Sequence, residues 1–261
     1  MSAILLDGGI VHFEVIGRGR PVIFLHGWVG SWRYWVPAMQ AASTGFRAYA
    51  LDLWGFGDTA RDKNRYIVDK QVALLDNFLH ELGMGKVAIV GHGLGALVGL
   101  LFTMHYPTAV DRLLTVELPL DEGSINSRLR TAALPELVDW LLLKNAASEP
   151  ARTDGLKADP LALAASLNSP DFFNLSNRIS NLNTPCLLVY GQNDPAISIP
   201  DYDKTTAPSS LHTMVFEQSS HFPMLDDPGG FNRLLIDFLA LPTGESPRVL
   251  QMKEEWKRRV R

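Results

Sequence analysis

The stretch Val87–Gly95 constrains the fold of this chain more than any other. It reads V-A-I-V-G-H-G-L-G, an apolar, mostly β-branched run followed by three closely spaced glycines, and the apolar segment 96–106 follows at once. This pattern is typical of a buried strand that turns sharply into a helix. Glycine accepts the positive φ of such a turn and lets strand and helix approach closely. We therefore expect a strand–turn–helix unit whose turn centres on Gly93.

Length and composition favour one globular α/β domain. The chain has 261 residues, of which 46% are hydrophobic and 20% charged, with a net charge of −4. This length can bury a sizeable core, and this charge gives no reason to expect a nucleic-acid partner. The single cysteine, Cys186, excludes a disulfide within the chain, and segment 1–11 lacks the basic start of a secretory signal. A cytoplasmic location is the resulting expectation.

Apolar runs and helical periodicities alternate along most of the chain. Such alternation predicts a mainly parallel, doubly wound sheet with helices on both faces. The expected strands are residues 10–15, 22–25, 48–51, 87–90, 113–118, 185–190 and 211–216, and the clearest helices are 66–82 and 228–239. Right-handed crossovers bring the loops after parallel strands to one edge, where ligands bind in such sheets. The loops that begin at His26, Asp52 and Gly91 should meet there.

The pattern changes between residues 120 and 183. No strong strand signal occurs, and helices are predicted over 134–144, opened by Pro135, and over 161–167. We interpret 120–183 as a helical cap inserted into a core made of residues 1–119 and 184–240. Surface helices that pack elsewhere are the alternative.

Five motifs now give a resemblance. They follow predicted strands in a fixed order: His26-Gly27-Trp28, the loop 52–58, Gly91-His92-Gly93-Leu94-Gly95, Gly191-Gln192-Asn193-Asp194 and Ser220-His221-Phe222-Pro223. This order is similar to that of the α/β-hydrolase superfamily, and the resemblance covers about residues 8–240. It implies an α/β-hydrolase fold. It says little about the substrate, because this fold hosts many chemistries.

The resemblance implies a role for each matching position. Asp194 corresponds to the acid and His221 to the general base of a catalytic triad, and the backbone N–H groups of Trp28 and Leu94 correspond to the oxyanion donors. The serine nucleophile has no counterpart, since its position is Gly93, which has no side chain. Backbone donors do not depend on side-chain identity, so the anion pocket can survive the loss of serine.

Other readings of the same residues stay open. His221 and Asp194 can be a structural histidine and a helix cap, His92 can order the turn, and Asp52 can bind loop backbone. Glu117 and Asp121 offer an alternative acid position. No metal-ligand spacing and no phosphate loop is present, so no metal or cofactor is expected. The residues expected to line a ligand pocket are His26, Gly27, Trp28, His92, Phe222 and Trp140.

The segment 241–261 has a composition that differs from the rest of the chain. Residues 248–261 hold six basic and two acidic side chains, with Val249, Met252, Trp256 and Val260 at helical spacing. Such an amphipathic tail can dock on its own domain, on a second copy of the chain, or on an anionic membrane surface.

Three functions remain compatible with the sequence. The first is a non-nucleophilic pseudo-hydrolase that binds a small apolar or carbonyl-bearing ligand, or serves as a scaffold. The second is a serine hydrolase of the esterase type made inactive by a serine-to-glycine change. The third is a cofactor-independent enzyme that uses His221 and Asp194 as a general base, as some dioxygenases of this superfamily do.

Overall fold

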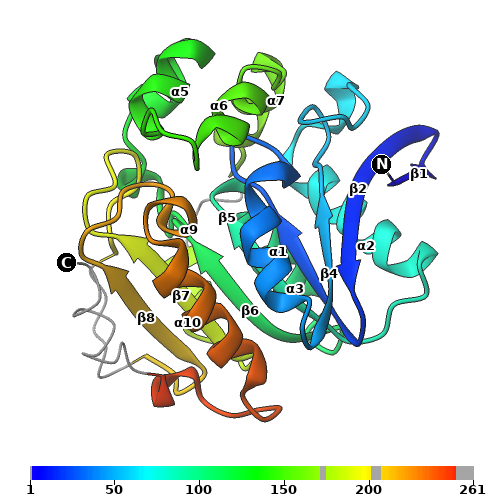
Figure 1. The fold of residues 1–261 in the computed structure, drawn as a ribbon. Coiled ribbons are helices and arrows are strands. Elements are labelled where there is room, and N and C mark those ends of the chain that lie inside the picture. The colour runs from blue at the N-terminus through cyan, green and yellow to red at the C-terminus, as the bar shows by residue number, and fades with distance from the viewer. Residues whose placement is uncertain (1, 171–174, 201–206, 251–261) are drawn as a thin grey trace.

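In the computed structural model, which describes residues 2–170, 175–200 and 207–250, the core is a single twisted sheet (Figure 1). Its strand order is β1-β2-β4-β3-β5-β6-β7-β8; β1 and β2 run antiparallel to their neighbours and β3 to β8 are parallel. The strands are β1 (Ser2–Leu6), β2 (Gly9–Gly17), β3 (Arg20–Leu25), β4 (Phe46–Leu51), β5 (Val87–His92), β6 (Val110–Val116), β7 (Cys186–Gly191) and β8 (Leu211–Phe216). The predicted α/β class with a mostly parallel sheet is confirmed.

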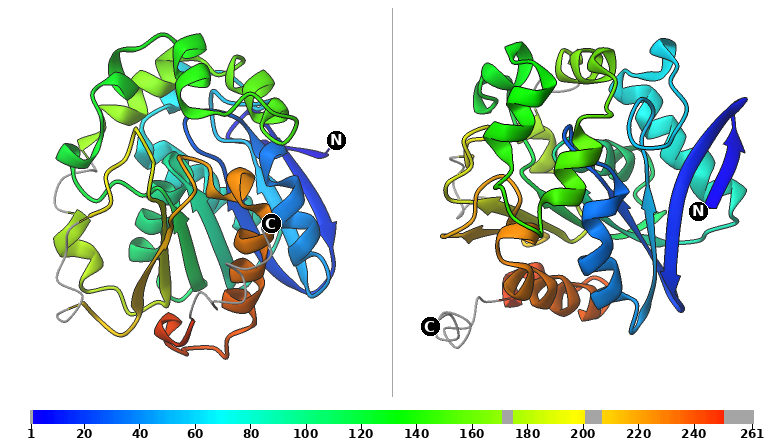
Figure 2. Two further views of the ribbon diagram at one scale, coloured as in Figure 1. Left: turned by 60° about the vertical axis from the view of Figure 1, so that its left-hand side comes forward. Right: turned by 45° about the horizontal axis from the view of Figure 1, so that its top comes forward.

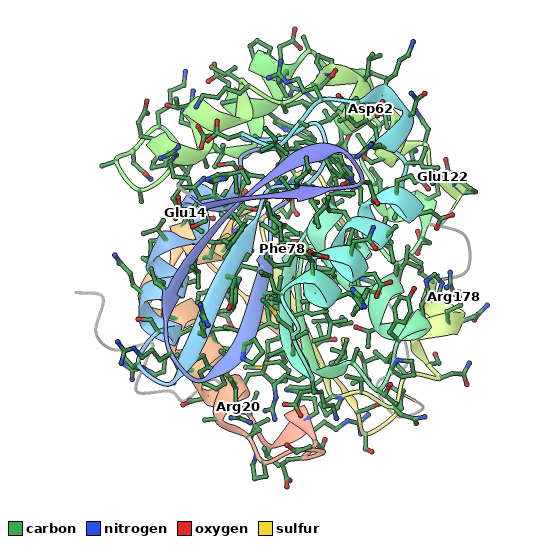
Figure 3. All side chains as sticks on the ribbon, turned by 90° about the vertical axis from the view of Figure 1, so that its right-hand side faces the viewer. Glu14, Arg20, Asp62, Phe78, Glu122 and Arg178 are labelled. Atoms are coloured by element: carbon green, nitrogen blue, oxygen red, sulfur yellow. The ribbon has the colours of Figure 1, made fainter. Side chains whose placement is uncertain are left out.

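Helices cover both faces of this sheet. On one face α1 (Val36–Ala42) packs against α10 (Pro228–Ala240), and on the other α2 (Val68–Glu81) packs against α3 (Leu94–His105). Their apolar faces are directed inward: Phe78 of α2 lies against the sheet in Figure 3 and is fully buried. The core therefore lies in two layers, one on each side of the central strands.

A group of short helices lies between β6 and β7. These are α4 (Arg128–Thr131), α5 (Leu134–Leu141), α6 (Glu149–Gly155), α7 (Pro160–Leu167) and α8 (Leu175–Ile179). Figure 2 shows α5, α6 and α7 above the carboxyl ends of the strands, the edge that carries the loops after β3, β4 and β5. The helix predicted over 134–144 ends earlier, at Leu141.

Several strands begin or end at other residues than expected, and two of the differences have local reasons. β1 was not expected; it forms because Asp7 and Gly8 both take positive φ, +49° and +79°, as the two-residue turn of a β-hairpin requires. The strand expected over 113–118 ends at Val116, because Glu117 leaves the β region with φ of +50°.

The chain after α10 returns along β8. The guanidinium of Arg248 donates to the carbonyl oxygens of Leu211, Ala207 and Pro208. A 3₁₀ turn, η5 (Pro247–Val249), precedes Leu250, the last described residue. The amphipathic face predicted for the tail lies mostly in 251–261, outside the described residues. Within the described residues, no helix has the length and apolar character needed to cross a membrane.

One close approach holds β3 and α3 together. A Cβ added to Gly95 would lie 2.5 Å from the carbonyl carbon of Leu25 and closer still to its oxygen. Real side chains do not reach such distances from backbone, so helix and strand would have to separate. The absence of a side chain at residue 95 thus sets the spacing between α3 and β3.

We predict that Gly95→Ala costs about 3 kcal/mol or more of unfolding free energy, since overpacking against rigid backbone forces main-chain shifts. Gly85→Ala is the control, because its added Cβ meets nothing within 4 Å. Urea denaturation of both variants measures the difference. Equal stabilities would show that α3 can move away from β3 freely.

Candidate active site

The turn between β5 and α3 has the geometry that the glycine cluster predicts. Gly93 takes φ of +47° and ψ of −107°, a conformation that residues with a Cβ rarely adopt. Its N–H donates to Val116 and its carbonyl accepts from Leu97. Leu94 is the first residue of α3, so its N–H has no acceptor within the helix. The turn therefore presents a backbone donor, but no nucleophilic side chain, at its tip.

Asp194 and His221 lie in contact, as the triad order implies. The Nδ1 atom of His221 is 2.8 Å from Oδ2 of Asp194, and both side chains are almost fully buried. Burial alone would raise the pKa of Asp194, but the charge and hydrogen bond of His221, followed by those from Glu117 and the Ala196 amide, lower it. An ionised Asp194 can only accept, so Nδ1 of His221 carries the hydrogen and a neutral ring has its lone pair on Nε2. Within the described part of the chain, that Nε2 makes no hydrogen bond.

His92 connects the two halves of the site. Gly27 N–H donates to the Tyr34 hydroxyl at 2.7 Å, and that hydroxyl lies 2.9 Å from Nδ1 of His92. Nε2 of His92 lies 3.0 Å from the carbonyl oxygen of His221. Burial holds the pKa of His92 well below its usual value, so the ring is neutral and donates from Nε2. A continuous chain of hydrogen bonds thus runs from the loop after β3 to the loop after β8.

Aromatic packing fixes this chain of hydrogen bonds in place. The ring of Phe222 lies 4.7 Å from that of His92 and 5.5 Å from that of Tyr34. The rings of His92 and His221 are tilted at 58° to each other, with centroids 4.8 Å apart. In this structure His92 and Phe222 therefore pack against each other and against the ring of His221. Their predicted contact with a ligand stays a prediction.

His26 and Asp52 organise the loops after β3 and β4. His26 is fully buried; Nδ1 lies 2.8 Å from the Gly27 carbonyl, and Nε2 accepts from Leu53 N–H at 3.0 Å. Both ring nitrogens thus bind backbone. Asp52 accepts from the backbone of Trp32 and of Asp58, which matches its alternative reading as a loop residue.

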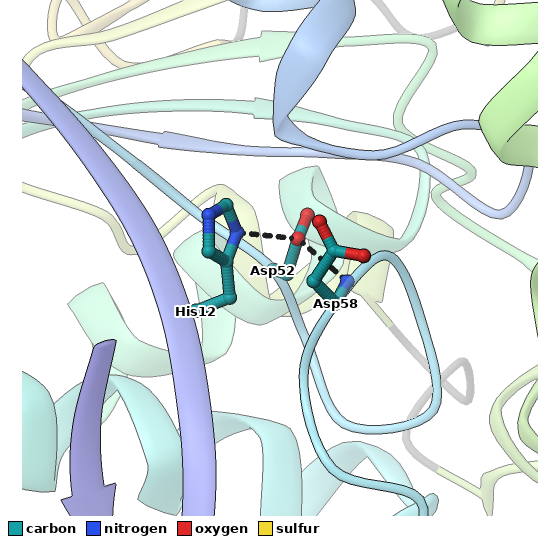
Figure 4. A group of neighbouring side chains, drawn as sticks. All are labelled: His12, Asp52 and Asp58. Atoms are coloured by element: carbon teal, nitrogen blue, oxygen red, sulfur yellow. Dashed lines mark hydrogen bonds and ion pairs between the residues drawn. The ribbon is translucent and has the colours of Figure 1, made fainter. Parts of the chain in front are cut away.

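A buried ion pair supports the same loop. Nδ1 of His12 lies 2.9 Å from Oδ2 of Asp52, which also accepts from the Asp58 amide at 3.1 Å (Figure 4). Among the described residues, one cluster of three or more histidine, cysteine or acidic side chains is compact enough to share a metal ion. This cluster consists of His12, Asp52 and Asp58. Because the Asp52 oxygen already has two donors, we interpret this group as a structural ion pair.

The indole of Trp28 lies over the turn. A Cβ added to Gly93 would lie 3.0 Å from Cε3 and 3.1 Å from Cζ3 of this ring, tighter than nearly all real Cβ contacts. The ring is fully buried, and its Nε1 donates to the hydroxyl of Ser166 on α7 at 3.1 Å. A side chain at residue 93 would therefore require the ring of Trp28 to shift by a few tenths of an ångström. The orientation of its backbone N–H as an oxyanion donor stays a prediction.

Two other predicted residues lie elsewhere. Trp140 is on α5, and the guanidinium of Arg128 lies 4.9 Å from the centre of its ring. This contact joins two residues of the helical segment between β6 and β7. Asp121 accepts from Ser124 N–H and caps the short 3₁₀ turn η3 (Glu122–Ser124). Glu117, the other alternative acid, is fully buried beside Asp194.

Comparison with known proteins identifies the protein family. The sequence model described as "Alpha/beta hydrolase family" matches residues 22–234. The chain belongs to this family. Its hydrolase relatives include the pimeloyl-[acyl-carrier protein] methyl ester esterase of Vibrio cholerae, 28% identical over 87% of this chain and 97% of the relative. The human protein named epoxide hydrolase 4 is 24% identical over 89% of this chain and 76% of its own.

Solved α/β-hydrolase structures agree in fold. An esterase from Exiguobacterium antarcticum superposes with a TM-score of 0.80 at 16% identity, covering 92% of this chain and 99% of that one. A serine-to-glycine mutant of an N-acyl homoserine lactonase, complexed with N-hexanoyl homoserine lactone, also gives 0.80, at 18% identity and with 91% and 96% covered. At these identities the likeness concerns the fold.

Sequence reasoning missed Tyr34. It lies in an aromatic run, Trp32-Arg33-Tyr34-Trp35, to which the sequence analysis assigns no site role. The run forms a 3₁₀ turn, η1 (Trp32–Trp35), which Ser31 caps by accepting from Arg33 N–H through its hydroxyl. No local signal marks the hydroxyl of Tyr34 as the link to His92, because its partners are 7 and 58 residues away in the chain.

We predict that the His12–Asp52 pair makes stability depend on pH. The hydrogen bond to Asp52 raises the pKa of His12, although burial opposes it. A raised folded-state pKa favours the native state while the ring is protonated. Its contribution is complete below the unfolded pKa of about 6.5 and is lost as pH rises through the higher folded value.

Urea denaturation between about pH 6 and pH 9 checks this dependence. The unfolding free energy of the wild type should fall more steeply with rising pH than that of His12→Gln. His80→Gln, at an exposed position of α2, is the control. Parallel curves for wild type and His12→Gln would contradict the prediction.

Proposed function

We propose that this α/β-hydrolase-family protein binds a small carbonyl-bearing ligand without forming a covalent intermediate. The contact between Trp28 and Gly93 carries this proposal. A serine at residue 93 would place its Cβ 3.0 Å from a fully buried indole that is hydrogen-bonded to α7. The surroundings of residue 93 are thus fitted to glycine, so glycine is part of the site's packing.

The remaining polar groups support recognition of a carbonyl. Leu94 N–H has no acceptor in α3 and suits a carbonyl oxygen. The lone pair on His221 Nε2, oriented through Asp194, suits a hydroxyl, an amine or water beside that carbonyl. We propose the helices of 120–183 as the cap that closes this site, since Ser166 of α7 already contacts Trp28.

A second candidate uses the same pair as a general base. His221 Nε2 can take a proton from a water molecule, whose oxygen then attacks the carbonyl carbon of a bound ester while Leu94 N–H stabilises the oxyanion. The oxyanion then collapses, the acyl C–O bond breaks, and the alkoxide leaves as an alcohol with the proton from His221. The buried 2.8 Å contact between His221 and Asp194 favours this candidate. Its product would be that of an esterase, which is the activity named for the Vibrio cholerae relative.

We predict that methyl hexanoate binds and is not hydrolysed. The probe offers an ester carbonyl, and hexyl methyl ether of the same length lacks it. In ¹⁵N–¹H spectra the Leu94 amide should shift with the ester and stay in place with the ether. Release of hexanoate at a rate abolished by His221→Ala would support the general-base candidate instead, and absence of an ester-specific shift would contradict binding of this ligand class.

We predict that the indole blocks a restored serine. Gly93→Ser alone should react with a serine-directed fluorophosphonate about 10-fold or more slowly than Gly93→Ser combined with Trp28→Ala, because overpacking at residue 93 costs about 1–3 kcal/mol. Gly93→Ala and Gly93→Ala/Trp28→Ala are the controls without a hydroxyl. Labelling of Gly93→Ser as fast as that of the double variant would support a serine hydrolase inactivated by one substitution.

A further inference from the structure

A second buried carboxyl group stands behind the His221–Asp194 pair. Glu117 follows β6, is fully buried, and takes φ of +50°, which residues with a Cβ rarely adopt. Its N–H donates to the Val189 carbonyl, and Gly191 N–H donates to its Oε1 at 2.6 Å. β6 and β7 therefore hold this carboxyl group at the start of the loop that carries Asp194.

The other carboxyl oxygen of Glu117, Oε2, indicates whether this carboxyl group is protonated. Oε2 is buried, and no N–H or O–H of the described residues donates to it. After burial, the charge of Asp194 and a side-chain hydrogen bond to it raise the pKa of this carboxyl group, so the two acids lie close together. Two carboxyl groups can form such a bond only if one of them carries a proton. The orphaned oxygen is thus explained if it is a donor.

The neighbours decide which of the two acids carries the proton. Asp194 accepts from His221 and from the Ala196 amide, and both contacts favour its charged form. Among the described residues, the donor to Glu117 is the Gly191 amide, and the negative charges of Asp194 and Asp226 act on its carboxyl group. Burial first, and these charges next, raise the pKa of Glu117 well above its usual range.

We propose that Glu117 is a positioning residue that keeps its proton at neutral pH and donates it in a hydrogen bond to Asp194. Asp194 then receives three donors, from Glu117, Ala196 and His221, which fix the plane of its carboxylate. A carboxylate that shares its lone pairs in this way binds the imidazolium form of His221 less strongly. Glu117 thereby sets both the orientation and the basicity of His221.

Infrared spectroscopy of the free protein tests the protonation. Protein labelled with ¹³C at the side-chain carboxyl of glutamate should show an isotope-shifted band of a protonated acid at pH 7. Because only glutamates carry the label, this band cannot come from an aspartate such as Asp226. The band should vanish in Glu117→Gln and remain in Glu81→Gln, at an exposed position of α2. No band at neutral pH, or a band that survives in Glu117→Gln, overturns the proposal.

The pH titration of the His221 ring by NMR tests the positioning role. Glu117→Gln keeps a donor for Asp194 and an acceptor for the Gly191 amide, so the midpoint should stay near that of the wild type. Glu117→Met removes the donor, and the midpoint should rise by about 1 pH unit. An unchanged midpoint in folded Glu117→Met overturns the role; if this variant does not fold, the infrared result with Glu117→Gln still decides the protonation.

The importance of this role rests on the proposed function of His221, whereas the protonation does not. Because both spectra are recorded without ligand, they separate the two proposals. Loss of methyl hexanoate binding with an intact glutamic acid band removes only the binding proposal. Binding without that band removes only the role of Glu117.

Discussion

The close approach of α3 to β3 is the contact on which the site depends. Gly95 leaves no room for a side chain beside the Leu25 carbonyl. Because α3 begins only one residue earlier, this spacing also fixes the position of Gly93 at the tip of β5. The Leu94 amide, the packing of Trp28 and the distance to the loop after β8 all follow from where that tip lies. A steric constraint between backbones thus precedes all the polar chemistry.

Hydrogen bonds then connect loops that the sheet alone would only bring near one another. The path from Gly27 through Tyr34 and His92 to His221 crosses from the loop after β3 to the loop after β8. All of its members are buried, so an unmade bond would be costly and the path resists local rearrangement. The position of His221 relative to the turn before Leu94 is therefore a property of the whole edge rather than of one loop.

The sequence was sufficient for the sheet, the turn and the contact of Asp194 with His221, because each of these depends on local patterns or on motif order. Glycines at 91, 93 and 95 are readable as a sharp turn, and β-branched runs as buried strands. The roles of Tyr34 and Glu117 were not readable. Both act through partners far away in the chain, and the left-handed φ of Glu117 is imposed by β7 rather than by its own residue type. The β1 hairpin, by contrast, had a local signal in Asp7-Gly8.

The hydrogen bond between Trp28 and Ser166 has a mechanical consequence. The indole belongs to the loop after β3, and its acceptor belongs to α7 in the helical segment between β6 and β7. A side chain at residue 93 would press on this ring, and a displaced ring would release one tie between the two parts. The packing beside Gly93 and the seating of the helical segment are thus linked through one side chain.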